Sequence, residues 1–590
     1  MNPTGEDVPR FERRLFDPAR RISRIGTGSL GGKARGLVTA ARILDERRAD
    51  LEVPGLCLDV PALCVVATSV FESFLDRNGL RPVLEEGPSD QVVALAFQRA
   101  TLPAEWLGDL RAVADDARVP LACRSSSALE DALGRPFAGV YGTKMIPGNQ
   151  PDVAGRFRSL VDAVKFVFAS TFFHEARAYR TAAGERLEPE KMAVVVQETV
   201  GRRHAERFYP DLSGVARSYN FYPVGPAEPA QGVVDLALGL GKTIVDGGAC
   251  WSFSPAHPKL PPPVGSVRDL VDVTQSEFWA VNVGPPPPYD PMTETEYLVR
   301  RSLAEAEADG TLRYAASTYD AGSDRLVPGM GRAGPRVLDF APILARNELP
   351  LVPALRRLLA VCEEELEAPV EIEFALSLPA GQAARLGFLQ VRPLLVSRQA
   401  VSVTPEDLAS PFSVIASAAA MGNGRQEVND VVYVEPETFE ARLTPAIASE
   451  IEGLNRSLVD QARPYLLVGF GRWGSADPWL GIPVRWDQIS GARGIVEAPL
   501  PQMNPEPSQG SHFFHNLTSF SVLYFTVSLH AGRGVDWGWL ARQEVVARTE
   551  HVRHVRTEAP LVLRVDGRSR RGVAHPGGGQ NEARARPEKA

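Results

Sequence analysis

The chain has 590 residues, of which 44% are hydrophobic and 23% are charged, and its formal net charge is -8. This length corresponds to several domains, and the composition is that of a soluble globular protein with little tendency for general nucleic-acid binding. No apolar run approaches the roughly 18 residues of a membrane span, and the first 21 residues carry no apolar signal core, so we expect a cytoplasmic protein without a membrane partner.

Five regions are expected in chain order: a flexible arm at 1–20, a first α/β lobe at 20–200, a second lobe at 201–400, a smaller C-terminal domain at 401–542, and a disordered tail at 543–590. The first lobe alternates helices with apolar strands. The tail is rich in arginine, glycine and proline and poor in large apolar residues, which is typical of disorder. The five cysteines form no CxxC pair, which predicts a reducing compartment and neither disulfides nor structural zinc.

A glycine-dense turn leads into a predicted helix near the start of the first lobe. Gly31, Gly32 and Lys33 close the turn, and a helical run continues through Ile43. Such a turn suits phosphates at a helix N-terminus, with the lysine reaching over them. The spacing is not that of a P-loop, so an ordinary glycine-rich turn with a surface lysine is the alternative.

An apolar strand from Leu121 then delivers Arg124 and the hydroxyl of Ser125 into a loop. An arginine fork matches phosphate oxygens, although a hydroxyl-capped turn with a surface arginine fits this segment equally well. Further along, the pattern from Val153 to Tyr179 predicts one long helix, and an apolar strand over 192–196 follows it.

Two predicted strands near the end of the second lobe bring polar groups together. Glu371 and Glu373 are two residues apart in one strand and so share a face, and Gln390 and Arg392 close the other strand. Two carboxylates, an amide and a guanidinium suit a divalent cation and the phosphates of a nucleotide. An ordinary hairpin with a solvated acidic face is the alternative for these residues alone.

Taken together, the ordered motifs over about 20–400 resemble the N-terminal nucleotide-binding region of the phosphoenolpyruvate synthase and pyruvate phosphate dikinase family. The motifs are GGKARGL, CRSSSALED followed by FAG, MAVVVQETV, LSGV, LGLGKTIVDGG, EIEFA and LQVRP. The resemblance implies an α/β (α+β) fold, with a two-lobed ATP-grasp domain followed by a smaller mixed or β-rich C-terminal domain.

The resemblance also implies roles for the residues of these motifs, with ATP and Mg²⁺ as cofactors. The implied nucleotide contacts are Lys33 and Arg124 on the phosphates, Gly139 and Thr143 lining the same site, Gln197 near the adenine, and Gln390 and Arg392. The implied metal ligands are Glu371, Glu373 and Gln390. Arg392, Glu373 and Lys33 are the implied catalytic residues, with Arg392 on the transferred phosphoryl group.

The chain departs from the family pattern at two of these positions. The family usually has aspartate where Glu371 stands, and glutamate is a longer ligand. Phosphoenolpyruvate synthases commonly carry glutamate where Lys242 stands, and here we expect a solvated loop lysine rather than a further phosphate contact.

The resemblance does not extend to the C-terminal domain. No copy of the family's phosphorylated-histidine motif is evident there, and the segment around His512 resembles it only faintly because Phe513 and Phe514 follow the histidine. Glycine, arginine and tryptophan are clustered over 468–479. This segment fits either a binding loop or a small β-rich domain whose turns are filled by aromatic side chains.

The leading function is therefore a phosphotransferase that moves phosphoryl from ATP to a histidine or small-molecule acceptor. The acceptor is unknown, and a separate histidine-domain protein is a possible partner. The alternatives are a non-catalytic ATP-sensing module and a kinase of an exogenous small molecule, similar to rifampin phosphotransferases.

Overall fold

A computed structural model describes residues 8–17, 20–85, 87–130, 139–182, 190–221, 223, 225–261, 267–379, 381–394, 396, 401–475, 479–500, 517, 522–528 and 534–577. The chain divides into two compact units, Met1–Leu394 and Leu395–Ala590. We call them the first and second unit and describe each by itself. Within the described parts of the chain, every helix is too short or too polar to span a bilayer.

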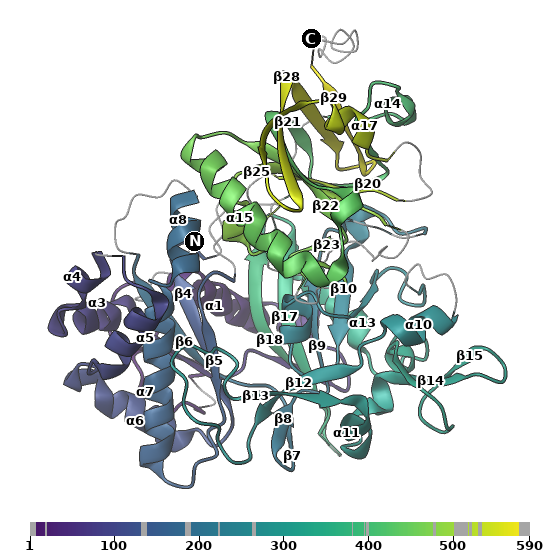
Figure 1. Cartoon of the computed structure of the whole chain (residues 1–590). Coiled ribbons are helices and arrows are strands. Elements are labelled where there is room, and N and C mark those ends of the chain that lie inside the picture. Colours follow the sequence, from purple (N-terminus) through teal and green to yellow (C-terminus); the bar gives the residue numbers. More distant parts are fainter. Residues whose placement is uncertain are drawn as a thin grey trace. The chain divides into compact units, whose positions relative to one another are not determined.

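The first unit begins with a five-stranded sheet in the order β1-β3-β6-β4-β5. Its strands are β1 (Ile22–Ile25), β3 (Leu63–Val66), β4 (Leu121–Ser127), β5 (Thr143–Ile146) and β6 (Met192–Glu198). Strands β3 and β6 are almost entirely buried, which explains why they are continuous apolar runs rather than alternating ones. Helix α7 (Val153–Ser170) packs against β4 and β5 (Figure 1).

A six-stranded second sheet has the order β11-β10-β9-β17-β18-β2. Its strands are β2 (Leu56–Asp59), β9 (Leu212–Arg217), β10 (Val233–Ala237), β11 (Trp251–Phe253), β17 (Val370–Ser377) and β18 (Ala384–Pro393). The predicted strands around Glu371 and Arg392 are confirmed as the antiparallel pair β17 and β18. Strand β2 lies far earlier in the chain yet pairs with β18, so the expected first lobe contributes to this sheet.

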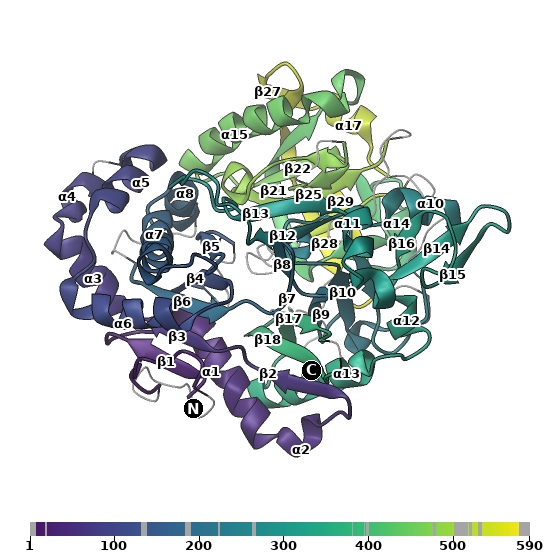
Figure 2. The ribbon, with the colours of Figure 1, turned by 90° about the horizontal axis from the view of Figure 1, so that it is seen from below.

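Helix α1 (Gly31–Glu46) connects the two sheets. It contacts β4 of the first sheet and β18 of the second, and Figure 2 shows it beside β18 and β2. Its apolar residues, including Leu37 and Ile43, belong to one core cluster that also holds Leu63 of β3 and Ile372 of β17. This shared core fixes the start of α1 between the two sheets.

Two smaller sheets and further helices complete the first unit. One is a four-stranded sheet of β7 (Arg202–His204), β8 (Arg207–Tyr209), β12 (Glu277–Asn282) and β13 (Leu298–Ser302). The other is a three-stranded sheet of β14 (Ala316–Asp320), β15 (Arg325–Pro328) and β16 (Arg336–Leu338). The further helices are α2 (Arg48–Leu51), α3 (Thr68–Arg77), α4 (Leu80–Glu85), α5 (Asp90–Arg99), α6 (Ala104–Asp116), α8 (His174–Ala182), α9 (Lys242–Val245), α10 (Val267–Val273), α11 (Leu303–Ala308), α12 (Ala341–Leu344) and α13 (Leu351–Leu366).

Two expectations for the first unit are wrong. The predicted single helix from Val153 to Tyr179 is broken into α7 and α8, because a tight turn at Phe172 bonds back to Ala169 and redirects the chain. The expected flexible arm is packed over its described residues 8–17, where Val8, Phe11 and Leu15 are buried.

The second unit is built on a mixed sheet in the order β19-β29-β28-β21-β22-β25-β26-β20, with β27 beside β28. Its strands are β19 (Ile415–Ser417), β20 (Ala419–Met421), β21 (Gly424–Val434), β22 (Tyr465–Phe470), β25 (Ala492–Ala498), β26 (Leu523–Thr526), β27 (Glu544–Arg548), β28 (Val552–Asp566) and β29 (Arg571–Pro576). The end strands β19 and β20 are separated by one residue, so this segment closes the sheet on itself. Helix α15 (Thr444–Asp460) packs on β21 and β28 (Figure 1).

The expectation of a disordered tail from residue 543 is wrong for residues 544–577. Strand β28 pairs with β21 along its length, and Val555, Leu563 and Ala574 are core residues. Strand β28 carries Arg553, Arg556 and Arg564 among residues that are mostly buried. The arginine content hid this strand in the sequence. Residue 512 and residues 578–590 lie outside the described parts of the chain.

Candidate active site

Close packing of two glycines places Lys33 beside the end of strand β4. Gly31 has φ +79°, and a Cβ on Gly32 would lie 1.8 Å from the carbonyl oxygen of Glu130, so neither position accepts a side chain without a shift. Nζ of Lys33 lies 2.5 Å from Oε1 of Glu130 and 3.3 Å from Oγ of Ser125. The glycine-rich turn and the hydroxyl segment therefore form one corner of the first unit.

Arg124 joins the first sheet to the second. From β4, its Nη1 donates to the carbonyl of Leu389 at 2.8 Å, and its Nη2 lies 2.8 Å from both Oε2 of Glu373 and Oε1 of Gln390. The motif around Arg124 thus meets two later motifs at one guanidinium, with sequence separations of 249 residues to Glu373 and 266 residues to Gln390.

A β-bulge shapes the strand pair at this point. Glu371 lies opposite Arg392 and Glu373 lies opposite Gln390, but the next pair skips Leu389. An unpaired residue in a bulge redirects its backbone groups. Here the carbonyl of Leu389 accepts the hydrogen bond from Arg124, so the irregularity serves the contact between the sheets.

Glu371 has a different environment from Glu373. Its Oε1 accepts from Nε of Arg392 at 2.8 Å and also from Nη2, and its Oε2 accepts from Nε of Arg217 at 2.7 Å. Arg217 also donates to Asp235 at 2.9 Å. Burial lowers the pKa of Arg217, but the two carboxylates outweigh burial and hold the pKa above its ordinary value.

The remaining predicted site residues lie on the first sheet or beside it. Gln197 of β6 is buried, and its Nε2 has no hydrogen-bond partner among the described residues. Thr143 lies opposite Arg124, and its backbone N–H donates to Glu294 at 3.3 Å. Gly139 has φ +75° in the turn before β5. Among the described residues, the contacts of Gln197, Thr143 and Gly139 do not identify what these residues bind, so their roles stay predictions.

Lys242 is not the solvated loop lysine that we expected. It begins the short helix α9, its Nζ lies 3.2 Å from Asp246 and 3.6 Å from Glu294, and its side chain is mostly buried. Because Glu294 also accepts from Thr143, Lys242 is linked to a predicted site residue through one carboxylate.

The sequence did not single out Glu130, Arg217, Asp235 or Glu294 as site residues. A signal was present for two of them: Arg217 and Asp235 are the charged residues of two strands that are otherwise uncharged and mostly buried. Charged side chains are rarely fully buried unless they are paired, so their position pointed to buried partners.

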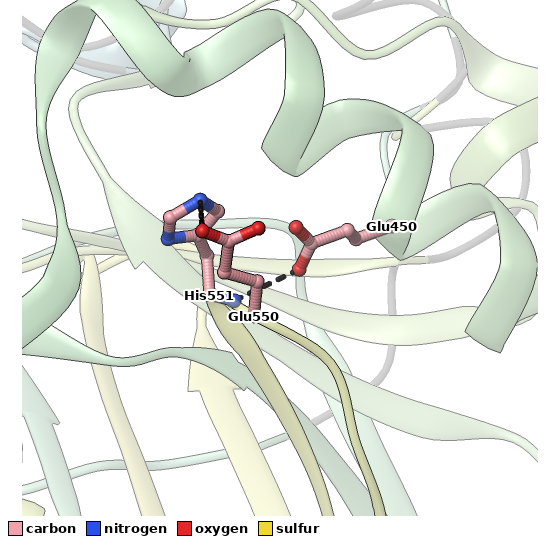
Figure 3. A group of neighbouring side chains, drawn as sticks. All are labelled: Glu450, Glu550 and His551. Carbon is pink, nitrogen blue, oxygen red and sulfur yellow. Dashed lines mark hydrogen bonds and ion pairs between the residues drawn. The ribbon is translucent and has the colours of Figure 1, made fainter.

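A separate group in the second unit brings three potential metal ligands together. Side-chain atoms of Glu450, Glu550 and His551 lie within 4.8 Å of one another (Figure 3). However, Glu450 already accepts from Oγ1 of Thr549 at 2.5 Å and from the backbone N–H of His551 at 3.0 Å. A metal-bound histidine usually donates its other ring N–H, whereas Nδ1 of His551 is buried without a hydrogen-bond partner among the described residues. The hydrogen bonds explain this group as a cap on the turn between β27 and β28.

In the first unit, Arg124 of β4 thus contacts the carboxylate of Glu373 and the amide of Gln390, and Lys33 of α1 contacts Ser125 of the same strand β4. Residues 27–410 match the family described as pyruvate phosphate dikinase, AMP/ATP-binding domain, and the chain belongs to this family. The chain is also similar to a phosphoenolpyruvate synthase of Aeropyrum pernix, with 25% identity over 432 residues. That alignment covers 68% of this chain and 45% of the relative, so the chain spans less than half of the relative's length.

Proposed function

We propose that the chain is an ATP-dependent phosphotransferase whose site lies where Lys33, Arg124 and the β17–β18 pair meet. Membership of the ATP-binding family supports the nucleotide. Lys33 and Arg124 would hold the phosphates, because both cationic side chains are partly exposed and Lys33 contacts Ser125, the residue next to Arg124. Arg392 would contact the transferred phosphoryl group.

The observation that carries this proposal is the position of Arg124. Nη2 of its guanidinium lies 2.8 Å from both Oε2 of Glu373 and Oε1 of Gln390, so these two oxygen atoms converge on one positive charge. Side-chain oxygens of this kind are the ligands that Mg²⁺ prefers. Glu373 and Gln390 would therefore hold Mg²⁺, and Arg124 would turn from these oxygens toward the phosphates.

The chemistry required of the protein is mainly positioning and charge neutralisation. A bound Mg²⁺ would supply positive charge between the phosphate oxygens. Lys33 is held by Glu130 and Ser125, which would keep its ammonium group directed to the same region before the nucleotide arrives. The acceptor is a histidine or a small molecule, and a histidine on a separate protein is compatible with the proposal.

Phosphorus NMR of the purified chain with ATP and Mg²⁺, with and without cell extract, tests the function. We expect ATP consumption in wild type, with AMP and phosphate as products of dikinase chemistry or ADP as the product of a simple kinase. Glu373→Gln is the matched control, because it keeps the side-chain shape and removes the charge that faces the metal. ATP binding without turnover under every condition would instead identify an ATP-sensing module.

A further inference from the structure

A row of hydrogen-bonded side chains crosses the second sheet and ends at Arg392. The row consists of Ser252, Asp235, Arg217, Glu371 and Arg392, which lie on β11, β10, β9, β17 and β18. These five strands are consecutive neighbours in the sheet. Each member of the row is therefore bonded to the member on the adjacent strand.

The strand register places most of these pairs directly opposite one another. Ser252 pairs with Asp235, Arg217 pairs with Glu371, and Glu371 pairs with Arg392. Directly opposite residues in antiparallel strands point to the same face of the sheet. Arg217 and Asp235 are two positions out of register, and the length of the arginine side chain spans that offset with a 2.9 Å bond.

The charges alternate along the row. Asp235 and Glu371 are negative, Arg217 and Arg392 are positive, and all four are buried. A buried charge is tolerated when opposite charges and hydrogen bonds surround it. Because Glu371 accepts from both Nε and Nη2 of Arg392, one edge of that guanidinium is fixed and its plane is set.

We propose that Arg217 and Asp235 are positioning residues for Arg392, and that Glu371 is the anchor of Arg392 rather than a metal ligand. This inference rests on the proposed function, since it assigns the row to the arginine that contacts the phosphoryl group. Each carboxylate oxygen of Glu371 is engaged by a guanidinium, whereas Glu373, which is 16% exposed, and Gln390 each direct one oxygen to Arg124. The sheet thus supplies the rigidity that a flexible arginine lacks.

Kinetics of Arg217→Lys test the proposal. Lysine keeps the charge but cannot bond two carboxylates with a planar fork, so Glu371 and Arg392 should shift. We expect kcat for ATP consumption to fall about 10- to 100-fold, because small misplacements of a catalytic group have effects of this size. The KM for ATP and the Mg²⁺ dependence should change less than about twofold, because ground-state binding is untouched.

Arg385→Lys is the matched control. Arg385 lies on the same strand β18 and also bonds two carboxylates, Asp59 and Glu198, but it is not part of the row. This variant should keep wild-type kcat. Wild-type kcat in Arg217→Lys would overturn the proposal, as would an increased Mg²⁺ requirement in Glu371→Gln equal to that in Glu373→Gln.

Crystal structures of the Arg217→Lys and Arg385→Lys variants give a readout that does not depend on turnover. We expect the Arg392 guanidinium to leave its two-point contact with Glu371 in Arg217→Lys and to keep it in Arg385→Lys. An unmoved Arg392 in both variants would overturn the positioning role. If wild type binds ATP without consuming it, the proposed function fails while these structures still decide whether the row positions Arg392.

Discussion

The two units both bury charged side chains, but they use them differently. In the first unit, side chains of Lys33, Arg124 and Glu373 come from distant segments and remain 12%, 14% and 16% exposed. In the second unit, Asp430 is 2% exposed, and it pairs with Arg463 at 2.6 Å and with His554 at 2.8 Å. The first group keeps contact with solvent, whereas the second is enclosed by its own partners.

The pKa of Asp430 illustrates the enclosed arrangement. Burial raises its pKa, but hydrogen bonds from His554, Arg463 and Arg556 outweigh burial, and the pKa lies below its ordinary value. Asp430 is therefore a fixed anion on β21 that binds His554 and Arg556 of β28 and also Arg463, which lies two residues before β22. A buried charge alone does not identify a functional site, whereas convergence of partly exposed charges from separate motifs indicates one.

Replacing Arg392, which is only 3% exposed, tests whether the proposed site extends to a buried charge of the first unit. We expect Arg392→Ala to reduce kcat for ATP consumption by about 10²- to 10³-fold, the usual effect of removing one donor to a charge that develops in the transition state. ATP affinity should fall much less, because the phosphoryl charge changes most in the transition state. Single-turnover kinetics and calorimetry of the same samples separate the two effects.

Asp430→Asn serves as the control from the enclosed group. It should lower thermal stability and leave ATP turnover per folded molecule unchanged. Near wild-type turnover in Arg392→Ala, with saturating ATP and Mg²⁺, would remove Arg392 from the catalytic machinery. Loss of turnover in folded Asp430→Asn would show that the two groups do not differ in the way proposed.

A smaller effect is expected for the two cations that we propose to contact the phosphates. Lys33→Ala and Arg124→Ala should each weaken ATP binding by about 10- to 100-fold, because a hydrogen bond to a charged group contributes about 1.5 to 3 kcal/mol. Isothermal titration calorimetry measures the change, and circular dichroism confirms folding. Unchanged affinity in both variants would contradict the assignment of phosphates to this corner of the first unit.

The contrast between the units also explains which parts the sequence could predict. The strand positions of residues within a short motif were predicted correctly: Glu371, Glu373, Gln390 and Arg392 lie in the expected strand pair because a two-residue alternation fixes their faces. Partners that belong to other motifs were missed, because no local pattern connects Arg217 with Glu371, which is 154 residues away. The sequence therefore did not show that Arg217 and Arg392 bond the two carboxylate oxygens of Glu371, which was expected to be a metal ligand.

Longer-range errors have a similar origin. The strands of residues 544–577 were assigned to a disordered tail because they are rich in arginine, and the pairing of β21 with β28 joins segments about 130 residues apart. Likewise, the pairing of β2 with β18 could not be inferred from the first lobe alone. Local periodicity predicts helices and strands, but which strand pairs with an edge strand depends on the whole sheet.

The smallest predicted effect compares one buried carboxyl group in each unit. Burial raises the pKa of Glu497 in the second unit to about 7, and burial raises the pKa of Glu190 in the first unit to about 7. Both accept a short hydrogen bond from a tyrosine, Tyr524 and Tyr141 respectively. Neither group is solvated well enough to ionise at its ordinary pKa.

Because the folded-state pKa of Glu497 lies above the ordinary value of 4.5, its contribution to stability is complete below that value and is lost as pH rises through about 7. Between pH 6 and pH 8 the loss should be about 1 kcal/mol, which Glu497→Gln should remove because a glutamine does not ionise. Thermal unfolding of wild type and variant at the two pH values measures the difference. Glu190→Gln should flatten the same dependence by a similar amount, and an unchanged pH dependence in Glu497→Gln would show that this carboxyl group already ionises near its ordinary pKa.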